Sequence, residues 1–182
     1  MSDTLGRHYL ENVLKNFRDL KRLADRALAQ LGDEEFFLRT SEEANSVSLI
    51  VKHVAGNLRS RWRDFLTTDG EKPDRRRDSE FEVEGGDTRA SLTAAWERGW
   101  QILFDEVGAL SPGDLTRRVS IRGEAHTVVE AVNRQLTHYG QHVGQIVFLA
   151  KHLKADAWET LSIPRGQSET FNAKMAGDKP RG

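Results

Sequence analysis

Four stretches of the sequence repeat apolar residues at alternating steps of three and four, and this period constrains the fold more than any other feature. It is the period of an α-helix that buries one stripe of side chains. It predicts core helices over about residues 5–31, 46–66, 88–109 and 128–153. The last of these starts at a capping box formed by Thr127 and Glu130. Four such stripes predict an all-α protein that folds as a four-helix bundle.

The segments that connect these helices differ in length. Residues 67–87 form a polar segment, longer than the roughly two to eight residues of a tight helical connection, so we expect a long crossover between two parallel helices. Residues 118–125 alternate apolar and polar side chains around Gly123, which predicts a short β-hairpin before the fourth helix. Beyond residue 154 the pattern fades, and a short fifth helix is expected over Ser168–Met175.

The composition narrows the class of protein. A chain of 182 residues suits one domain over residues 1–182, with a C-terminal tail over 154–182. The formal net charge is -1, so no overall field attracts nucleic acid or an anionic membrane. The chain has no cysteine, which excludes disulfides, a thiolate nucleophile and a cysteine zinc site. Because it also lacks a signal-peptide core and an apolar run of about eighteen residues, we expect a cytoplasmic protein with neither nucleic acid nor membrane as a partner.

The stretch LTHYGQHVGQI places His138 and His142 four residues apart on the fourth predicted helix. This spacing puts their Cβ atoms about 5 to 6 Å apart, which allows both imidazoles to bind one metal ion. His53 lies among apolar positions of the second predicted helix and is the third candidate ligand. Three neutral imidazoles leave at least one coordination position open, as in catalytic zinc sites. The alternative is that these are ordinary hydrogen-bonded histidines, and spacing alone leaves both interpretations open.

Other residues of the same stretch bear on this interpretation. Gly140 and Gly144 each cost about 1 kcal/mol of helix propensity relative to alanine, which indicates a close helix crossing, simple packing contacts or room for a ligand. Tyr139 stands where a zinc peptidase carries its glutamate base, so that chemistry is disfavoured. The remaining histidines lie near predicted helix ends, where surface roles are expected; they are His8, His126 and His152.

Arginines and tryptophans offer further candidate positions. Two arginine clusters could bind carboxylates in a bidentate manner; they are Arg59, Arg61 and Arg63, and Arg75–Arg77. Such runs are more often solvated faces paired with acids, here Asp64, Asp74 and Asp78. The tryptophans at helical spacing are predicted to belong to the core rather than to a pocket; they are Trp62, Trp96 and Trp100. The tail residues Trp158, Leu161 and Ile163 are expected to dock on the edge of the core.

Three segments together resemble one known family. They are NSVSLIVKHVAGNLRSRW (45–62), LTHYGQHVGQI (136–146) and LSIPRGQSETFN (161–172), and they are similar to the DinB-like superfamily, also typified by YfiT-like proteins. The resemblance covers about Tyr9 to Asn172. It implies a four-helix bundle of up-down-down-up order and a divalent metal ion, zinc or nickel, held by His53, His138 and His142.

The same resemblance implies an activity. Members that act as enzymes are similar to S-transferases or isomerases that use bacillithiol, mycothiol or a related low-molecular-weight thiol, whereas the branch most similar to this sequence has no assigned reaction. The expectation is therefore a divalent-metal-dependent enzyme, a thiol-dependent S-transferase or a hydrolase, that acts on a small electrophile, with no catalytic residue assigned. A homodimer is also implied. The alternatives left open are a non-catalytic metal-stabilised dimer or small-ligand-binding module and, ranked below it, nucleic-acid binding through the arginines.

Overall fold

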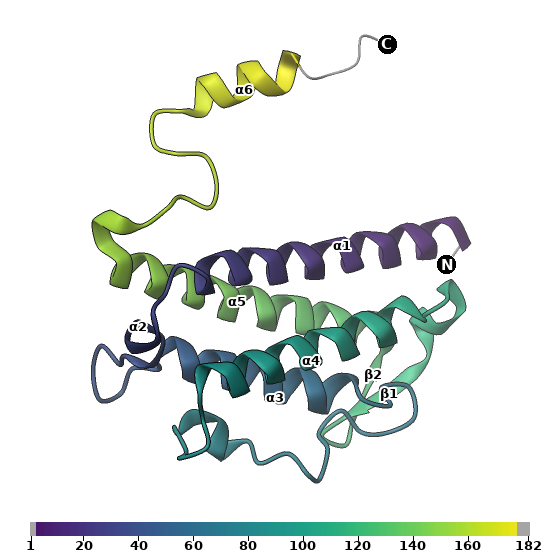
Figure 1. Ribbon diagram of the computed structural model, residues 1–182. Helices are drawn as coiled ribbons and strands as arrows, with labels where there is room; N and C mark the ends of the chain where they lie inside the picture. The colour runs from purple at the N-terminus through teal and green to yellow at the C-terminus, as the bar shows by residue number, and fades with distance from the viewer. Residues whose placement is uncertain (1–2, 178–182) are drawn as a thin grey trace.

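Most of the chain is helical in the computed structural model, which describes residues 3–177 and includes a small two-stranded sheet (Figure 1). Its four long helices correspond to the four predicted from the apolar period. They are α1 (Asp3–Leu28), α3 (Val47–Trp62), α4 (Arg89–Gly108) and α5 (Val128–Lys154). Helix α1 packs against α5 and α4, and α3 packs against the same two helices. The four helices therefore surround a shared apolar core.

Aromatic side chains fill the centre of this core. Trp62, Trp96 and Trp100 are each at most 1 % exposed, so the prediction that they belong to the core is confirmed. The Trp62 indole donates a hydrogen bond of 3.0 Å to the hydroxyl of Tyr139, which joins α3 to α5. The Trp96 indole likewise donates to Asp25 on α1, at 3.0 Å. These bonds satisfy buried donors and fix how the helices face one another.

Two predicted helix ends are wrong for the same reason. Helix α3 was expected to reach residue 66 but ends at Trp62, because Arg63 leaves the helical region and Asp64 has a positive φ of 49°. Helix α1 ends at Leu28 rather than near residue 31. In both cases the next residue of the apolar stripe, Phe65 or Leu31, stays buried although the backbone is no longer helical. The apolar period therefore continues past the end of the helix itself.

The connections contain elements of their own. Between α1 and α3 lies a short helix that the sequence did not reveal, α2 (Asp33–Phe37), whose Glu35 accepts a hydrogen bond from Gly32 N at 2.7 Å. The long polar crossover between α3 and α4 is confirmed, and its 3₁₀ helix η1 (Asp78–Phe81) packs against α3. A second 3₁₀ helix, η2 (Pro112–Thr116), follows α4.

The predicted hairpin is present before α5. It consists of antiparallel β1 (Arg118–Ile121) and β2 (Glu124–Thr127). Asp69 of the crossover holds its turn, because that carboxylate accepts hydrogen bonds from Arg122 N and Gly123 N, both at 2.8 Å. It also accepts from the Ser120 hydroxyl and from Glu71 N. One carboxylate therefore fastens the crossover to the hairpin.

The C-terminal part leaves the four long helices. After η3 (Ala155–Ala157), Trp158 and Leu161 pack on the core as predicted, while Ile163 is 38 % exposed. The predicted fifth helix is present as α6 (Ser168–Gly177), which stands apart from the long helices in Figure 1. Residues 1–2 and 178–182, which complete the predicted domain and tail, lie outside the described residues. No helix within residues 3–177 is long and apolar enough to cross a membrane.

Candidate metal centre

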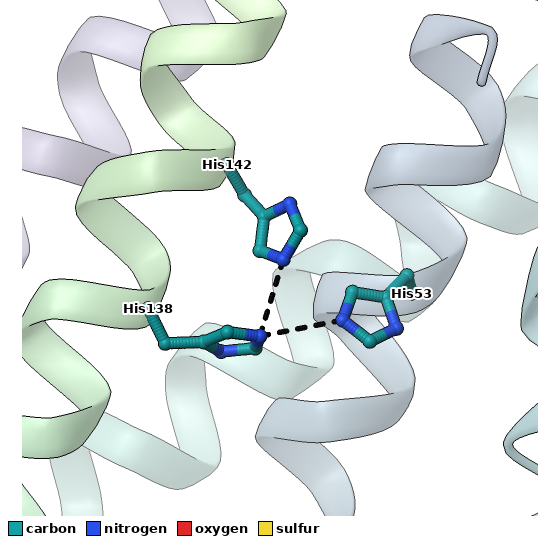
Figure 2. Close-up of side chains that lie close together, drawn as sticks. All are labelled: His53, His138 and His142. Carbon is teal, nitrogen blue, oxygen red and sulfur yellow. Dashed lines mark hydrogen bonds between the residues drawn. The ribbon is translucent and has the colours of Figure 1, made fainter. Parts of the chain in front are cut away.

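The three histidines singled out from the sequence converge. His53 projects from α3, and His138 and His142 project from α5, the helix packed against it (Figure 2). The Nε2 atom of His138 lies 3.3 Å from Nε2 of His53 and 3.1 Å from Nε2 of His142. Among residues 3–177, these three side chains form a group that could hold a metal ion, because their donor atoms all lie within 4.8 Å of one another.

These separations suit a tetrahedral ion. Two nitrogen ligands, each about 2.0–2.1 Å from zinc at a tetrahedral angle, lie about 3.3 Å apart. The distances of 3.3 and 3.1 Å from Nε2 of His138 to the other two Nε2 atoms match that spacing, and the donor atoms of all three residues lie within 4.8 Å of one another. The residues present therefore fit a divalent metal ion.

The hydrogen bonds on the far side of the rings fix which nitrogen is free. Nδ1 of His53 lies 2.9 Å from Oε2 of Glu80, and Nδ1 of His142 lies 2.9 Å from Oε1 of Gln145. Both oxygens can only accept, so each Nδ1 carries the proton and each Nε2 presents a lone pair. Both lone pairs face Nε2 of His138, whose own Nδ1 is buried without a partner. One proton on His138 cannot serve two acceptors well, whereas a cation at the centre accepts all three lone pairs.

The surroundings keep the imidazoles of α5 neutral. Burial is the largest cause that lowers the pKa of His138, and together with the neighbouring His142 and His53 it brings this pKa to about 3. Burial also lowers the pKa of His142, although the hydrogen bond with Gln145 opposes that shift. At neutral pH both rings therefore hold their lone pairs ready for a metal ion.

A buried ion pair supports His53 from behind. Glu80, in η1, is 5 % exposed and accepts hydrogen bonds of 2.8 Å from Nε and Nη2 of Arg75 as well as the bond from His53. Burial raises the pKa of Glu80, but the bonds from Arg75 and His53 outweigh it and the net shift is downward. The carboxylate thus stays ionised and orients the His53 ring, as carboxylates commonly do for metal-binding histidines. Sequence analysis missed Glu80, because it lies in a crossover without apolar periodicity.

A glycine of α3 makes room for this carboxylate. A Cβ atom at Gly56 would lie 2.8 Å from Cδ of Glu80 and closer still to Oε1. No real side chain tolerates such a contact without a shift of its neighbour. The sequence KHVAG, with glycine three residues after His53, is the signal that could have suggested a close approach here.

The two glycines near the α5 histidines behave differently. A Cβ atom at Gly140 or Gly144 would meet no atom within 4 Å among the described residues. The expectation that these glycines mark a close helix crossing or a packing contact is therefore wrong, because α5 presents both of them toward open space. The remaining histidines, His8, His126 and His152, do not join the cluster.

The arginine clusters divide into two groups. Arg59 and Arg63 bind the exposed carboxylate of Asp74, with shortest distances of 2.5 and 2.7 Å, as expected of a solvated charged face. Arg61 and Arg75 each have only 4 % of the side chain exposed, so for them that expectation is wrong. Arg61 is buried because α3 is covered on most of its circumference, whereas Arg75 lies in the crossover and is buried through its bonds to Glu80 and Glu71.

A pocket of about 300 Å³ opens beside the three histidines. Its walls come from α3, α5, η1 and the hairpin turn, and five arginines contribute to them; they are Arg61, Arg75, Arg77, Arg122 and Arg134. An ion held by the histidines would therefore be reachable from a cationic pocket. That arrangement can bind a small polar molecule next to a Lewis acid.

Comparison with known protein families gives a match. The sequence model of a family described as "Protein of unknown function (DUF1572)" matches residues 4–167. That range includes all three histidines, the crossover and the hairpin. A search of curated proteins found no match.

Proposed function

Because the chain belongs to the DUF1572 family, whose description assigns no activity, we propose from the site itself that the protein is a divalent-metal-dependent enzyme. His53, His138 and His142 would hold the ion, zinc or nickel. The observation that carries this proposal is the convergence of three Nε2 lone pairs at 3.1 and 3.3 Å beside an accessible pocket. A bound divalent ion would supply Lewis acidity, which lowers the pKa of a thiol or a water molecule.

The reaction class proposed is transfer of a low-molecular-weight thiol to a small electrophile, with hydrolysis by water as the related alternative. The chain has no cysteine, so a thiol would have to come with a cosubstrate. The protein's own residues would orient the ligands: Glu80 fixes the His53 ring, and Gln145 fixes the His142 ring. The pocket arginines would attract an anionic reactant.

The resemblance to the DinB-like superfamily is part of this proposal. It is supported by the convergence of the three residues that the resemblance implies as ligands. The up-down-down-up order of the helices is proposed on the same basis, with support from the long crossover between α3 and α4, which pack side by side. A homodimer is also proposed, and light scattering during size-exclusion chromatography would test it.

Metal analysis tests the central claim. Protein purified without a polyhistidine tag is reconstituted with zinc, nickel or manganese, dialysed and analysed for bound metal. We expect one ion per chain in the wild type and none in His53→Ala or His142→Ala. The control His152→Ala changes an exposed histidine of the same helix and should retain the metal. Absence of bound metal from the wild type with all three ions would refute the proposal.

A second experiment separates an enzyme from a metal-stabilised module. Conjugation of several thiols to monobromobimane or a chloronitrobenzene is measured with and without metal, alongside the melting temperature. We expect a metal-dependent rate that is lost in His142→Ala. A large thermal shift with no change in rate for any thiol would favour the non-catalytic alternative.

A further inference from the structure

Two rows of polar side chains face each other across the pocket. On α3, His53, Asn57 and Arg61 follow one another at steps of four residues, so they lie on one face of the helix. On α5, Gln135 lies one turn before His138 and also lines the pocket. The histidines occupy one end of these rows, and Arg61 lies at the other end, two turns or about 12 Å along α3.

Arg61 is buried, and two of its nitrogen atoms have no hydrogen-bond acceptor among the described residues. The residue is 3 % exposed, and the two atoms are Nε and Nη1. The nearest carboxylate oxygen, Oε2 of Glu71, lies 3.9 Å from Nη2, which is too long for a hydrogen bond. A guanidinium has five donors and does not lose its proton in proteins, so its burial without acceptors is costly.

The one carboxylate near Arg61 is already engaged. The same Oε2 atom of Glu71 accepts from Nη1 of Arg75 at 3.2 Å and from Nε of Arg122 at 3.3 Å. Arg75 in turn is committed to Glu80. Among the described residues that line the pocket, five are arginines and none is acidic. The pocket therefore carries excess positive charge, and Arg61 is its most buried cation, with two nitrogen atoms that lack an acceptor among the described residues.

A chain of hydrogen bonds makes the amino group of Asn57 a second donor in the row on α3. The Trp62 indole donates to the Tyr139 hydroxyl, which must then donate its own proton to Oδ1 of Asn57, at 2.9 Å. With its carbonyl oxygen committed to Tyr139, the Asn57 side chain can offer only its amino group to the pocket. Asn57 thus adds a donor between Arg61 and the histidines.

We infer that Arg61 is an anion-binding residue, and that the pocket takes a small molecule whose carboxylate or phosphate group binds Arg61 while another atom reaches the histidine triad. This inference rests on the proposed function for the metal-binding end of the ligand and adds its chemical class. Binding is a non-covalent step in which the anion supplies the acceptors that the guanidinium lacks. Planar bidentate contact with an oxyanion suits arginine better than lysine.

The test compares anion affinity in four proteins at constant ionic strength. Succinate and inorganic phosphate are the anionic probes, and succinamide is the neutral counterpart of succinate. Wild type, Arg61→Met, Arg61→Lys and the control Arg59→Met are titrated calorimetrically, both metal-free and after zinc loading. Arg59 lies on the same helix but is exposed, is paired with Asp74 and lines a different hollow between α3 and α4.

We expect the wild type to bind succinate or phosphate but not succinamide, and the preferred anion identifies the chemistry of the natural ligand. Arg61→Met should weaken the preferred anion at least tenfold, Arg61→Lys should recover part of that loss, and Arg59→Met should stay within twofold of the wild type. Without anion, Arg61→Met should melt no lower than the wild type, because it removes a buried charge that has no hydrogen-bonded counterion. A merely structural Arg61 would instead lower the melting temperature and leave anion affinity unchanged.

Two results would overturn the inference: equal anion affinity in wild type and both Arg61 variants, or equal affinity of the wild type for succinate and succinamide. Metal content measured on the same samples keeps this question separate from the proposed function. Loss of metal from the wild type with an anion affinity that depends on Arg61 would refute the metal proposal and retain the anion site. One bound ion per chain, together with an anion affinity that does not depend on Arg61, would retain the metal proposal and refute the anion site.

Discussion

Replacing Glu80 by glutamine tests the buried support of the metal centre. The carboxylate accepts three hydrogen bonds at 2.8–2.9 Å, two from Arg75 and one from Nδ1 of His53. Glutamine keeps one acceptor oxygen, loses the charge and places an amino group where the other oxygen was. If its oxygen takes the place of Oε2, that amino group faces the Nε–H of Arg75. At least one charged hydrogen bond is therefore lost, and a buried guanidinium loses its closest counterion.

The size of the effect follows from this geometry. Removing one partner of a buried ion pair costs about 3 to 5 kcal/mol, and we expect the lower end because Glu71 still binds Arg75. At about 2 to 4 °C per kcal/mol for a chain of this length, Glu80→Gln should lower the melting temperature by about 6 to 12 °C. Since the His53 ring also loses its fixed orientation, zinc affinity should fall by about 10- to 100-fold.

Two measurements check these values. Calorimetry of the metal-free protein gives the melting temperature, and competition with a chromophoric chelator gives the zinc affinity. The control is Glu84→Gln, in the same crossover, whose side chain is 44 % exposed and pairs with Lys52 at 3.0 Å; it should change stability by less than about 1 kcal/mol. A melting temperature within 2 °C of the wild type would refute the buried network. Lower stability with unchanged zinc affinity would refute the orienting role of Glu80.

Other substitutions test neighbouring features. Gly56→Ala should weaken zinc binding, because the new Cβ atom would displace Glu80, even though alanine has a higher helix propensity than glycine. Gly144→Ala should instead stabilise the protein by up to about 1 kcal/mol, because its Cβ atom meets no neighbour among the described residues. Zinc titrations and thermal melts compare the two variants. Asp69→Ala should cost about 2 to 4 kcal/mol in urea unfolding, since four donors lose their acceptor. The metal-free protein should lose stability as the pH falls from 6.5 toward 4, because unfolded histidine takes a proton near pH 6.5 and native His138 only near pH 3. Urea unfolding across that pH range measures whether the free energy of unfolding falls with the pH. The same pH dependence in His138→Gln as in the wild type would contradict the role of His138.

The sequence was sufficient to predict the four long helices and the pairing of His138 with His142, because both depend on regular spacing. Apolar residues at steps of three and four located all four long helices. The four-residue spacing of His138 and His142 guarantees that the two side chains lie on one helix face. Joining His53 to them required α3 to pack against α5, which spacing alone did not establish and which the structure provides.

The remaining parts of the site depend on contacts without a period. Arg75 and Glu80 lie in the crossover, Glu80 in its 3₁₀ helix η1, and their burial comes from the way the crossover folds over α3. Arg61 could not be distinguished from Arg59 and Arg63 by composition, because Arg61 and Arg59 differ only in which face of α3 they occupy and Arg63 lies just after the end of the helix. The same reason explains the wrong interpretation of Gly140 and Gly144. Their place in a helix was clear, but whether a neighbouring helix approached them was a matter of tertiary packing.

The attachment of the crossover to the hairpin by Asp69 has a consequence for how such proteins diversify. The three candidate metal ligands stand on long helices whose packing is shared with the core. Much of the cationic wall instead stands on the crossover and the hairpin turn, held by a few polar contacts. Loop segments accept substitutions and insertions more readily than packed helices. Selection can therefore change which reactant is admitted while it conserves the centre that activates it.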